Sequence, residues 1–429
     1  MRIEGKAAAA SMLSDFRRAL SALSTAVLLA GCAMALPVPE ADRAKIRKVA
    51  IAVADFPPNL EMRIQTGDTG AVGKVQAAVE ENVTRRLEAG DLREPLIEAL
   101  RRELAADEFQ ASVLPRSKVR TNADILPAYQ PQAKDVDAVL EVSLRSMVMV
   151  GAGSVNIVTR GSNELLAGLG AATQVRVIDS GNQRLLGDFK VGQFSGFAPL
   201  EDWMAKRGGR MDDTLEQLSR RLAADIVDQA LREYTPPEPR FDGEMPAPAP
   251  GTPDLALRPT IFSYYPIHAL RPVSLPPQRS DTANTLRPRY GAMGAFTPVT
   301  GYSNRPTLEW ERFPRVYAWA PERADAARIS GVTYEIRLYN ALRRHVSGGA
   351  DFLSPERVIY ERAGLAQPVH RPETELEPCA AYFWTARARF ALDGRVRVTP
   401  WMSVGPWRSP IAFATTPAAP DGKRCSYED

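Results

Sequence analysis

The stretch DVDAVLEVSLRSMVMV, residues 135–150, decides the fold of the first half of the chain. Two aspartates open it, and a run rich in valine, leucine and methionine follows, which is typical of a buried strand. Two shorter strands are predicted before it. One covers residues 46–54 and ends before Pro57 and Pro58, and the other covers residues 109–115. We therefore expect the stretch 135–150 to be a central strand of a sheet.

Helical patterns and a hairpin complete this domain. Leu96, Ile97, Leu100 and Leu104 have helical spacing within residues 91–109, and a second apolar stripe runs through residues 211–234. Residues 171–194 predict a hairpin, because Ser180-Gly181-Asn182 is a turn signal between two strand patterns. The order of strand, helix, strand, strand, hairpin and helix predicts an α/β sandwich, with helices packed on a mixed sheet, over residues 45–234.

Residues 59–91 carry a further pattern. Val75, Val79, Val83 and Leu87 recur every four residues, which predicts a second, exposed helix. Whether it covers a partner or only caps the domain stays open.

A proline-rich segment follows at residues 235–298. Proline at this density disfavours helix and central strand, so we expect an extended spacer between two domains. The stretch PTIFSYYPIHAL, residues 259–270, is apolar enough to dock on a neighbouring domain, although an ordered excursion of the spacer also fits.

The C-terminal part has the two-residue period of half-buried strands. The pattern occurs at residues 331–341 (GVTYEIRLYNA) and 381–390 (AYFWTARARF), and Trp310 is expected in an earlier strand. Leu376 and Tyr382 resemble the corner of fibronectin type III domains, in which the tyrosine hydroxyl ties the chain to upstream backbone. This resemblance implies a β-sandwich over residues 299–417 with a tail at 418–429, and the whole chain is then an α+β multidomain protein. The long basic stretch at residues 340–360 departs from the family pattern.

The N-terminus carries the features of a secretory signal. Arg17 and Arg18 precede an apolar run, residues 19–31, that is too short to span a bilayer. Leu29-Ala30-Gly31-Cys32 resembles the lipobox of bacterial lipoproteins. The resemblance implies a diacylglycerol on the thiol of Cys32, cleavage before it and acylation of the new N-terminus, with a tether at residues 32–44. The alternative is an ordinary signal peptide with an incidental cysteine.

The lipobox resemblance also implies a location. Lipoproteins kept at the inner membrane commonly carry aspartate after the cysteine, whereas this chain has Ala33, so we expect the outer membrane and its periplasmic face. On such a chain, the predicted α/β domain resembles that of the curli-secretion channel subunit, the peptidoglycan-synthase activators and the Tol-system propeller protein. The strands KVAIAVADF and DVDAVLEVSL and the long last helix carry this resemblance.

The charge of the chain bears on its partners, and its cysteine content bears on its disulfides. The 429-residue chain has a formal net charge of +3, and removal of residues 1–31, with four basic and two acidic residues, leaves about +1. The charges are of mixed sign along helical patterns, so we expect no nucleic-acid partner. If Cys32 is lipidated, Cys379 and Cys425 remain as a pair in an oxidising compartment, and we expect a disulfide between them.

Catalytic motifs are missing from the sequence. GDTGAVGKV, residues 67–75, lacks the first glycine and the final hydroxyl of a P-loop, and GAGSVN, residues 151–156, lacks the third glycine of a dinucleotide fingerprint. We expect no cofactor, metal site or catalytic residue. The histidines and the paired acids are expected on exposed surfaces: His268, His345, His370, Glu80-Glu81 and Asp212-Asp213.

Two tryptophans are candidate binding residues. Trp401 and Trp407 are predicted in the last loop of the sandwich, where aromatic rings stack on sugars or anchor a protein partner. They fit equally well as plugs of the sandwich end or as contacts of the spacer.

These patterns favour a non-enzymatic outer-membrane lipoprotein that binds or scaffolds a protein partner in envelope assembly, with oligomerisation possible. One alternative is an export pore whose membrane insert would be residues 146–177. The other is an envelope glycan hydrolase, which would need two converging carboxylates.

Overall fold

The computed structural model describes residues 36–54, 60–63, 71–89, 91–115, 133, 135–151, 166–204, 209–236, 270, 299–315, 320–344, 352–402 and 410–415. The chain divides into two compact units, Met1–Leu36 and Pro37–Asp429. The elements described below belong to the second unit.

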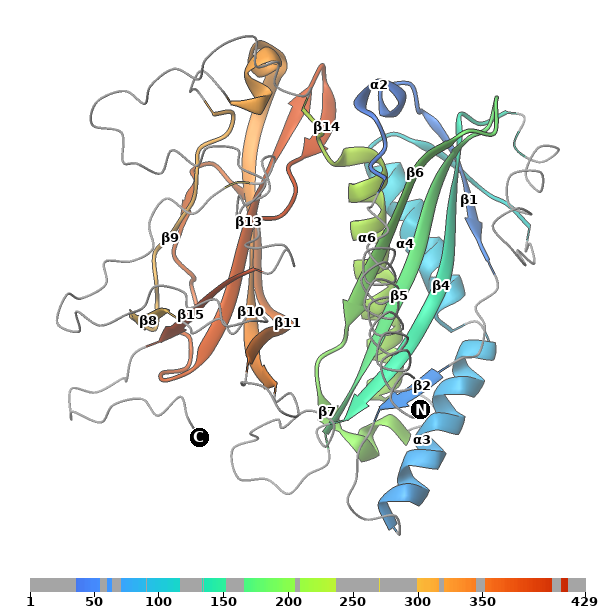
Figure 1. The fold of residues 1–429 in the computed structure, drawn as a ribbon, viewed down its shortest axis with the longest axis vertical. Helices are drawn as coiled ribbons and strands as arrows, with labels where there is room; N and C mark the ends of the chain where they lie inside the picture. Colours follow the sequence, from blue (N-terminus) through green and yellow to red (C-terminus); the bar gives the residue numbers. More distant parts are fainter. Residues whose placement is uncertain are drawn as a thin grey trace, which may run out of the picture. The chain divides into compact units, whose positions relative to one another are not determined.

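A seven-stranded mixed sheet forms the N-terminal domain (Figure 1). Its main strands lie in the order β3, β1, β4, β5 and β6, and β2 and β7 pair with β4 and β5. β1 is parallel to β3 and β4, whereas β4, β5 and β6 are antiparallel. The strands are β1 (Lys48–Val53), β2 (Leu60–Arg63), β3 (Gln110–Val113), β4 (Ala138–Gly151), β5 (Leu166–Asp179), β6 (Leu185–Phe194) and β7 (Ala198–Pro199).

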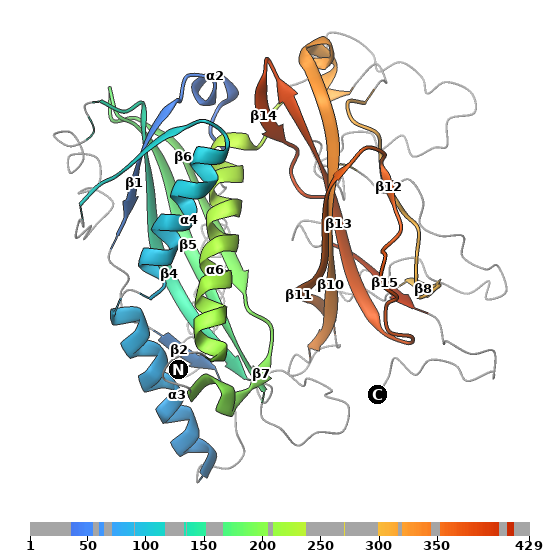
Figure 2. The same cartoon turned by 180° about the vertical axis from the view of Figure 1, so that it is seen from behind.

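Two long helices lie side by side across one face of this sheet, as Figure 2 shows. They are α4 (Arg93–Ala106) and α6 (Arg210–Val227), and the π-helical turn η3 (Asp228–Arg232) continues α6. Their apolar stripes pack on the sheet in one large core, which includes Leu96, Leu100, Leu218 and Leu222. The predicted mixed sheet with packed helices is confirmed. β4, which covers most of the stretch 135–150, lies between β1 and β5.

The stretch 59–91 contains more structure than an exposed helix. It forms β2 and then α3 (Ala71–Glu88), and Val79 and Val83 of α3 are fully buried. Asn82 donates a hydrogen bond to the carbonyl of Trp203 (2.9 Å), in the short helix η2 (Leu200–Met204). The prediction of an exposed helix is therefore wrong for one face. The four-residue period marked the face that packs on η2 and the sheet, and only the opposite face is exposed.

The approach of β5 to the chain that follows β6 requires a glycine at position 168. A Cβ on Gly168 would lie 2.7 Å from the carbonyl oxygen of Gly196 and against the ring of Phe194. We expect Gly168→Ala to lower the free energy of unfolding by about 1–3 kcal/mol, because backbone must move. Gly73, in α3, is the control: its Cβ would meet nothing within 4 Å, so Gly73→Ala should leave stability unchanged or raise it by up to about 1 kcal/mol. Urea unfolding of both variants checks this, and equal midpoints would contradict it.

The C-terminal domain is a separate, curled, largely antiparallel sheet. Six strands contribute, in the order β11, β10, β13, β15 and β8, with β14 paired to β13, and β9 and β12 form a small second sheet. β8 runs parallel to β15. The strands are β8 (Val299–Tyr302), β9 (Leu308–Glu309), β10 (Ile329–Arg344), β11 (Phe352–Leu365), β12 (Val369–His370), β13 (Ala381–Leu392), β14 (Arg395–Val398) and β15 (Ile411–Thr415).

One face of β10 and β13 forms the core of this domain. Tyr334, Ile336 and Leu338 of β10 and Trp384, Ala386 and Ala388 of β13 are buried in it, together with Trp310, which follows β9. The alternating residues that the sequence assigned to the buried face therefore lie in the core.

The chain between the domains is tied to the C-terminal domain at its start. Tyr234 is buried in the C-terminal core and its backbone N–H donates to the carbonyl of Val398 (2.8 Å). Leu270, the one described residue of the stretch 259–270, is fully buried in the same core. The segment that follows the last helix of the first domain thus contacts the second domain at Tyr234. Residues 237–269 and 271–298 lie outside the described part.

Candidate functional site

The most elaborate polar arrangement in the described residues joins the two domains, and we call it the ionic junction. It consists of acidic and basic residues from the C-cap of α4, from α6 and η3, and from the second face of β10 and β13: Asp107, Asp225, Asp228, Arg232, Glu335, Arg337, Arg387 and Arg389. In β10 and β13, these residues alternate with the core residues, because successive side chains of a strand point to opposite faces.

Asp228 is the centre of the ionic junction. Its carboxylate accepts hydrogen bonds from Arg232 (2.9 Å), one turn further along the chain, and from Arg387 of β13 (2.6 Å). Arg387 also donates to Glu335 (2.7 Å). Burial acts to raise the pKa of Asp228, but the two guanidiniums outweigh it and hold the pKa below its ordinary value. Asp228 is therefore a charged, buried group with two partners.

Arg232 and Arg389 extend the junction to the end of α4. Arg232 is ion-paired with Asp107 and donates to the carboxylate (3.1 Å) and the backbone carbonyl (2.9 Å) of Glu103. Arg389 approaches Asp107 at 3.5 Å and Glu335 at 3.8 Å. Asp107 and Glu335 are therefore shared between arginines, so removal of one ion pair disturbs the next.

Trp401 lies between two arginines of the ionic junction. The guanidinium carbons of Arg337 and Arg387 lie 4.4 Å and 4.3 Å from the centre of its ring, which is the geometry of a cation–π contact. Arg337 is also ion-paired with Asp225 (3.6 Å) and Glu361 (2.7 Å). Burial raises the pKa of Asp225 above its ordinary value, and Arg337 offsets only part of this effect. The ring of Trp401 thus contacts protein groups, and Trp407 lies outside the described residues.

Further contacts join the domains away from Asp228, at the short helix α2 (Glu40–Arg43) and at β11. Glu40 of α2 accepts hydrogen bonds from Arg397 of β14 at 2.7 and 3.0 Å and pairs with Arg43. The buried Arg43 donates to the carbonyl of Ala230 (3.3 Å). At β11, Glu356 accepts a hydrogen bond from the backbone N–H of Phe197 (3.0 Å).

The predicted corner residues lie at the start of β13. Tyr382 is buried, its ring is 5.5 Å from that of Phe413, and its hydroxyl accepts a hydrogen bond from the backbone N–H of Glu377 (2.9 Å). Leu376 is buried and its N–H donates to the carbonyl of Asn304 (2.8 Å). Cys379 is disulfide-bonded. Cys425, its predicted partner, and Cys32 with the lipobox lie outside the described residues.

His370 belongs to a small cluster on β11 and β12. Its Nε2 lies 2.7 Å from the hydroxyl of Tyr360, which is also hydrogen-bonded to Glu373. Desolvation lowers the pKa of His370, and Glu373 opposes the shift. The sequence predicted that His370 is exposed, whereas in the structure it is partly buried. His268 and His345 lie outside the described residues.

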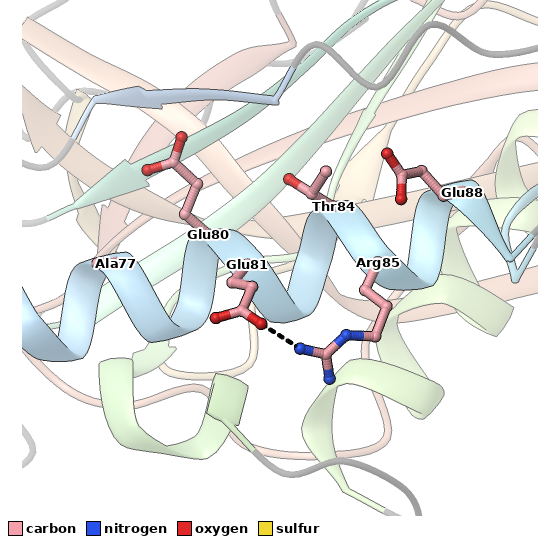
Figure 3. A pocket seen from close by; sticks show the side chains of 6 residues that line it. All are labelled: Ala77, Glu80, Glu81, Thr84, Arg85 and Glu88. Atoms are coloured by element: carbon pink, nitrogen blue, oxygen red, sulfur yellow. Dashed lines mark hydrogen bonds and ion pairs between the residues drawn. The ribbon is translucent and has the colours of Figure 1, made fainter.

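Two hollows on the surface of the N-terminal domain hold acidic residues. One, of about 470 Å³, lies along the outward face of α3, where Glu81 pairs with Arg85 (Figure 3). It is lined by Ala77, Glu80, Glu81, Thr84, Arg85 and Glu88. The other, of about 420 Å³, lies between ends of α3, α4 and α6, where Arg86 is ion-paired with both Asp91 and Asp212. Of the predicted acid pairs, Glu80-Glu81 is thus exposed and Asp212 is ion-paired.

Within the described ranges, no group of His, Cys, Asp and Glu side chains has the arrangement of a metal site. No helix in the part of the chain that the structure covers combines the length and apolar character needed to cross a bilayer.

Sequence reasoning missed every residue of the ionic junction. A signal was present: Glu335 and Arg337 in one strand, and Arg387 and Arg389 in another, occupy alternate positions opposite the core residues. Such a stripe marks the face of the two strands that lies opposite their core, although the pattern is the same whether that face meets water or another domain. Asp225, Asp228 and Arg232 repeat the same signal at helical spacing.

Comparisons with known proteins return structures but no sequence family. No family model matches the chain, and no curated protein matches it. Two of the similar solved structures are a PelC dodecamer from Paraburkholderia phytofirmans (14% identity, 46% of this chain and 96% of that one, TM-score 0.19) and protein XCC0632 from Xanthomonas campestris (13%, 44% and 89%, 0.22).

A third is a putative neuraminyllactose-binding hemagglutinin homolog from Helicobacter pylori (9% identity, 42% of this chain and 81% of that one, TM-score 0.21). All three TM-scores lie below 0.5.

Proposed function

We propose that the chain is an outer-membrane lipoprotein that faces the periplasm and acts as a non-enzymatic adaptor in envelope assembly, presenting two unlike domains to a protein partner. The ionic junction is the observation that supports this function best. It ties the two domains through buried charges, and an adaptor needs fixed spacing between its binding surfaces.

The energetics of buried charges favour a role in specificity. Two charges removed from water lose hydration, and their attraction barely repays that loss, so an apolar contact of the same size is often at least as stable. Removing one partner of a buried pair, in contrast, costs about 3–5 kcal/mol. Asp228, Arg232 and Arg387 therefore disfavour every arrangement of the domains in which they are not matched, which is how a junction selects one geometry.

The C-terminal domain, in this proposal, is a fibronectin type III-like module. The hydrogen bond of the Tyr382 hydroxyl to backbone five residues upstream supports it. So do the small second sheet of β9 and β12 and the contact of Trp310 with Trp384, whose ring centres are 6.2 Å apart.

The export-pore alternative is weaker. This alternative needs residues 146–177 as its membrane insert, but Met147, Met149 and Leu169 of that stretch are buried in the core of the first domain. Only residues 152–165 are left between β4 and β5, and a hairpin of a membrane barrel needs two strands of about 9–11 residues each. The acids gathered at the ionic junction, within the described residues, are matched by arginines and so give the hydrolase alternative no support.

Photo-crosslinking in intact cells tests the adaptor function. A crosslinking residue at the exposed Glu81 in one chain, and at the exposed Ile359 in another, samples both domains. We expect both positions to capture the same envelope complex, because an adaptor brings its two domains to one partner. Stable rings of this chain in detergent would favour the pore, and release of sugar from purified cell wall would favour the hydrolase.

Cys32→Ser tests the location. The substitution removes both the acylated thiol and the cleavage signal, so we expect an unprocessed or released chain in place of a membrane-bound one. A mass spectrum of the wild-type N-terminal peptide should carry diacylglycerol and acyl chains, and that of the variant should carry neither. The location is wrong if the variant fractionates with the outer membrane unchanged and the wild type shows no lipid mass.

A further inference from the structure

We propose that the end of the N-terminal domain that carries α2 lies against the phospholipid surface that holds the lipid on Cys32. The proposal rests on the lipidation in the proposed function and adds an orientation to it. Its basis is the short length of chain between Cys32 and Val38, the first buried residue among those that the structure describes.

Val38 is fully buried in the core of the N-terminal domain, directly before α2. Five residues lie between it and Cys32, so the two are six steps apart along the chain, and a fully extended chain advances at most about 3.3–3.6 Å per residue. Whatever conformation these residues adopt, the α carbon of Cys32 lies within about 20 Å of that of Val38. An acylated Cys32 therefore keeps this part of the domain at the bilayer.

The domain is longer than this tether. β4 runs from Ala138, which pairs with Val49 near the α2 end, to residues 147–150, which pair with β2. At about 3.3 Å per residue, these ends of the sheet are some 30 Å apart. α3 lies at the β2 end and α2 at the opposite end, as both views of the fold show (Figures 1 and 2). If the α3 end lay at the membrane, Val38 would be some 30 Å from the bilayer. A tether of about 20 Å does not span that distance.

The surface around α2 has mixed charge. Lys45, Arg47 and Lys48 are exposed, but Asp137 is close to the last two, since it accepts hydrogen bonds from their backbone N–H groups (2.7 and 2.8 Å). Arg184, in the turn between β5 and β6, is paired with Asp42 of α2 (2.8 Å). Such a surface is compatible with neutral and anionic headgroups alike. The tether, and not attraction to anionic lipid, therefore sets the orientation.

The C-terminal domain contributes to the same end. Arg395 of β14 is hydrogen-bonded to the carbonyl of Ala44, and Arg397 pairs with Glu40 of α2. The β13–β14 turn thus lies beside α2 and faces the membrane with it. The exposed face of α3 is left at the membrane-distal end, where a periplasmic partner has access.

Energy transfer to the bilayer tests the orientation. Lys45 and Lys74 are exposed lysines at opposite ends of the domain, in the loop after α2 and at the start of α3, so Lys45→Cys and Lys74→Cys form a matched pair. Each full-length variant is purified from membranes with its lipid, labelled with a donor dye at the new cysteine and reconstituted into vesicles that contain an acceptor-labelled lipid.

We expect the donor at position 45 to transfer energy several times faster than the donor at position 74, both in phosphatidylcholine vesicles and in vesicles of phosphatidylethanolamine with phosphatidylglycerol. Insertion of a long Gly/Ser segment after Cys32 should reduce the difference. Equal or reversed transfer, with the lipid confirmed on Cys32 by mass, overturns the orientation and leaves the lipoprotein function intact. Absence of the lipid mass overturns both.

Discussion

Asp228→Ala is expected to lower the free energy of unfolding by about 3–5 kcal/mol, because removal of one member of a buried ion pair generally costs this much. The side chain of Asp228 is 7% exposed and accepts hydrogen bonds from Arg232 and Arg387, which are 4% and 7% exposed. Without the carboxylate, both guanidiniums stay in a site that excludes water. The remaining acids near them, Asp107 and Glu335, already serve Arg389 as well.

The matched control is Asp213→Ala. Asp213 is an exposed residue in the first turn of α6, whose other end leads into Asp228. An acid at that place interacts with the helix dipole in water, so its loss should cost less than about 1 kcal/mol. Urea unfolding followed by circular dichroism compares the two variants at neutral pH.

A double-mutant cycle separates the pair from its surroundings. Removal of Arg387 together with Asp228 should cost less than the sum of the two single substitutions, with a coupling of about 0.5–3 kcal/mol, because the second loss relieves an unmatched charge. If Asp228→Ala unfolds within about 0.5 kcal/mol of the wild type, the ionic junction does not hold the domains in one arrangement.

The N-terminal fold was predictable because apolar runs and a turn signal, each contained in a short stretch of sequence, specify its strands and helices. The runs at 46–54 and 135–150 become β1 and β4, and Ser180-Gly181-Asn182 marks the turn between β5 and β6. β2 was not predicted, because its four residues carry no strand period of their own. Its strand conformation depends on pairing with residues 147–150 of β4, far away in sequence.

The ionic junction was not predictable in the same way. A polar stripe opposite an apolar one has the same sequence pattern whether it faces water or the complementary charges of another domain. Asp225 and Asp228 on α6 thus looked like a solvated helix face, and Arg387 and Arg389 like the wet side of a half-buried strand. Only the pairing of both stripes in space distinguishes the two cases. The same holds for Trp401, whose partners lie on β10 and β13.

Tyr382→Ala should be the second large effect, with a loss of about 3–5 kcal/mol in the free energy of unfolding of the C-terminal domain. Tyr382 is 5% exposed and packs on Phe413, the residue opposite it in β15. Truncation leaves a cavity in the core and removes the hydrogen bond from Glu377, and deletion of a buried aromatic ring generally costs this much. Tryptophan fluorescence is a suitable probe, because Trp310 and Trp384 lie in the same core.

Two further variants divide this loss into its parts. Tyr382→Phe keeps the ring and removes the hydroxyl, so it should cost only about 0.5–1.5 kcal/mol for the hydrogen bond. Tyr360→Ala removes a tyrosine of the edge strand β11 that is only partly buried and packs against the border of the core, so it should cost less than Tyr382→Ala. If Tyr382→Phe is as damaging as Tyr382→Ala, the hydroxyl and not the packed ring stabilises the corner. If both substitutions are neutral, Tyr382 is not a corner residue and the resemblance to fibronectin type III domains loses its main support.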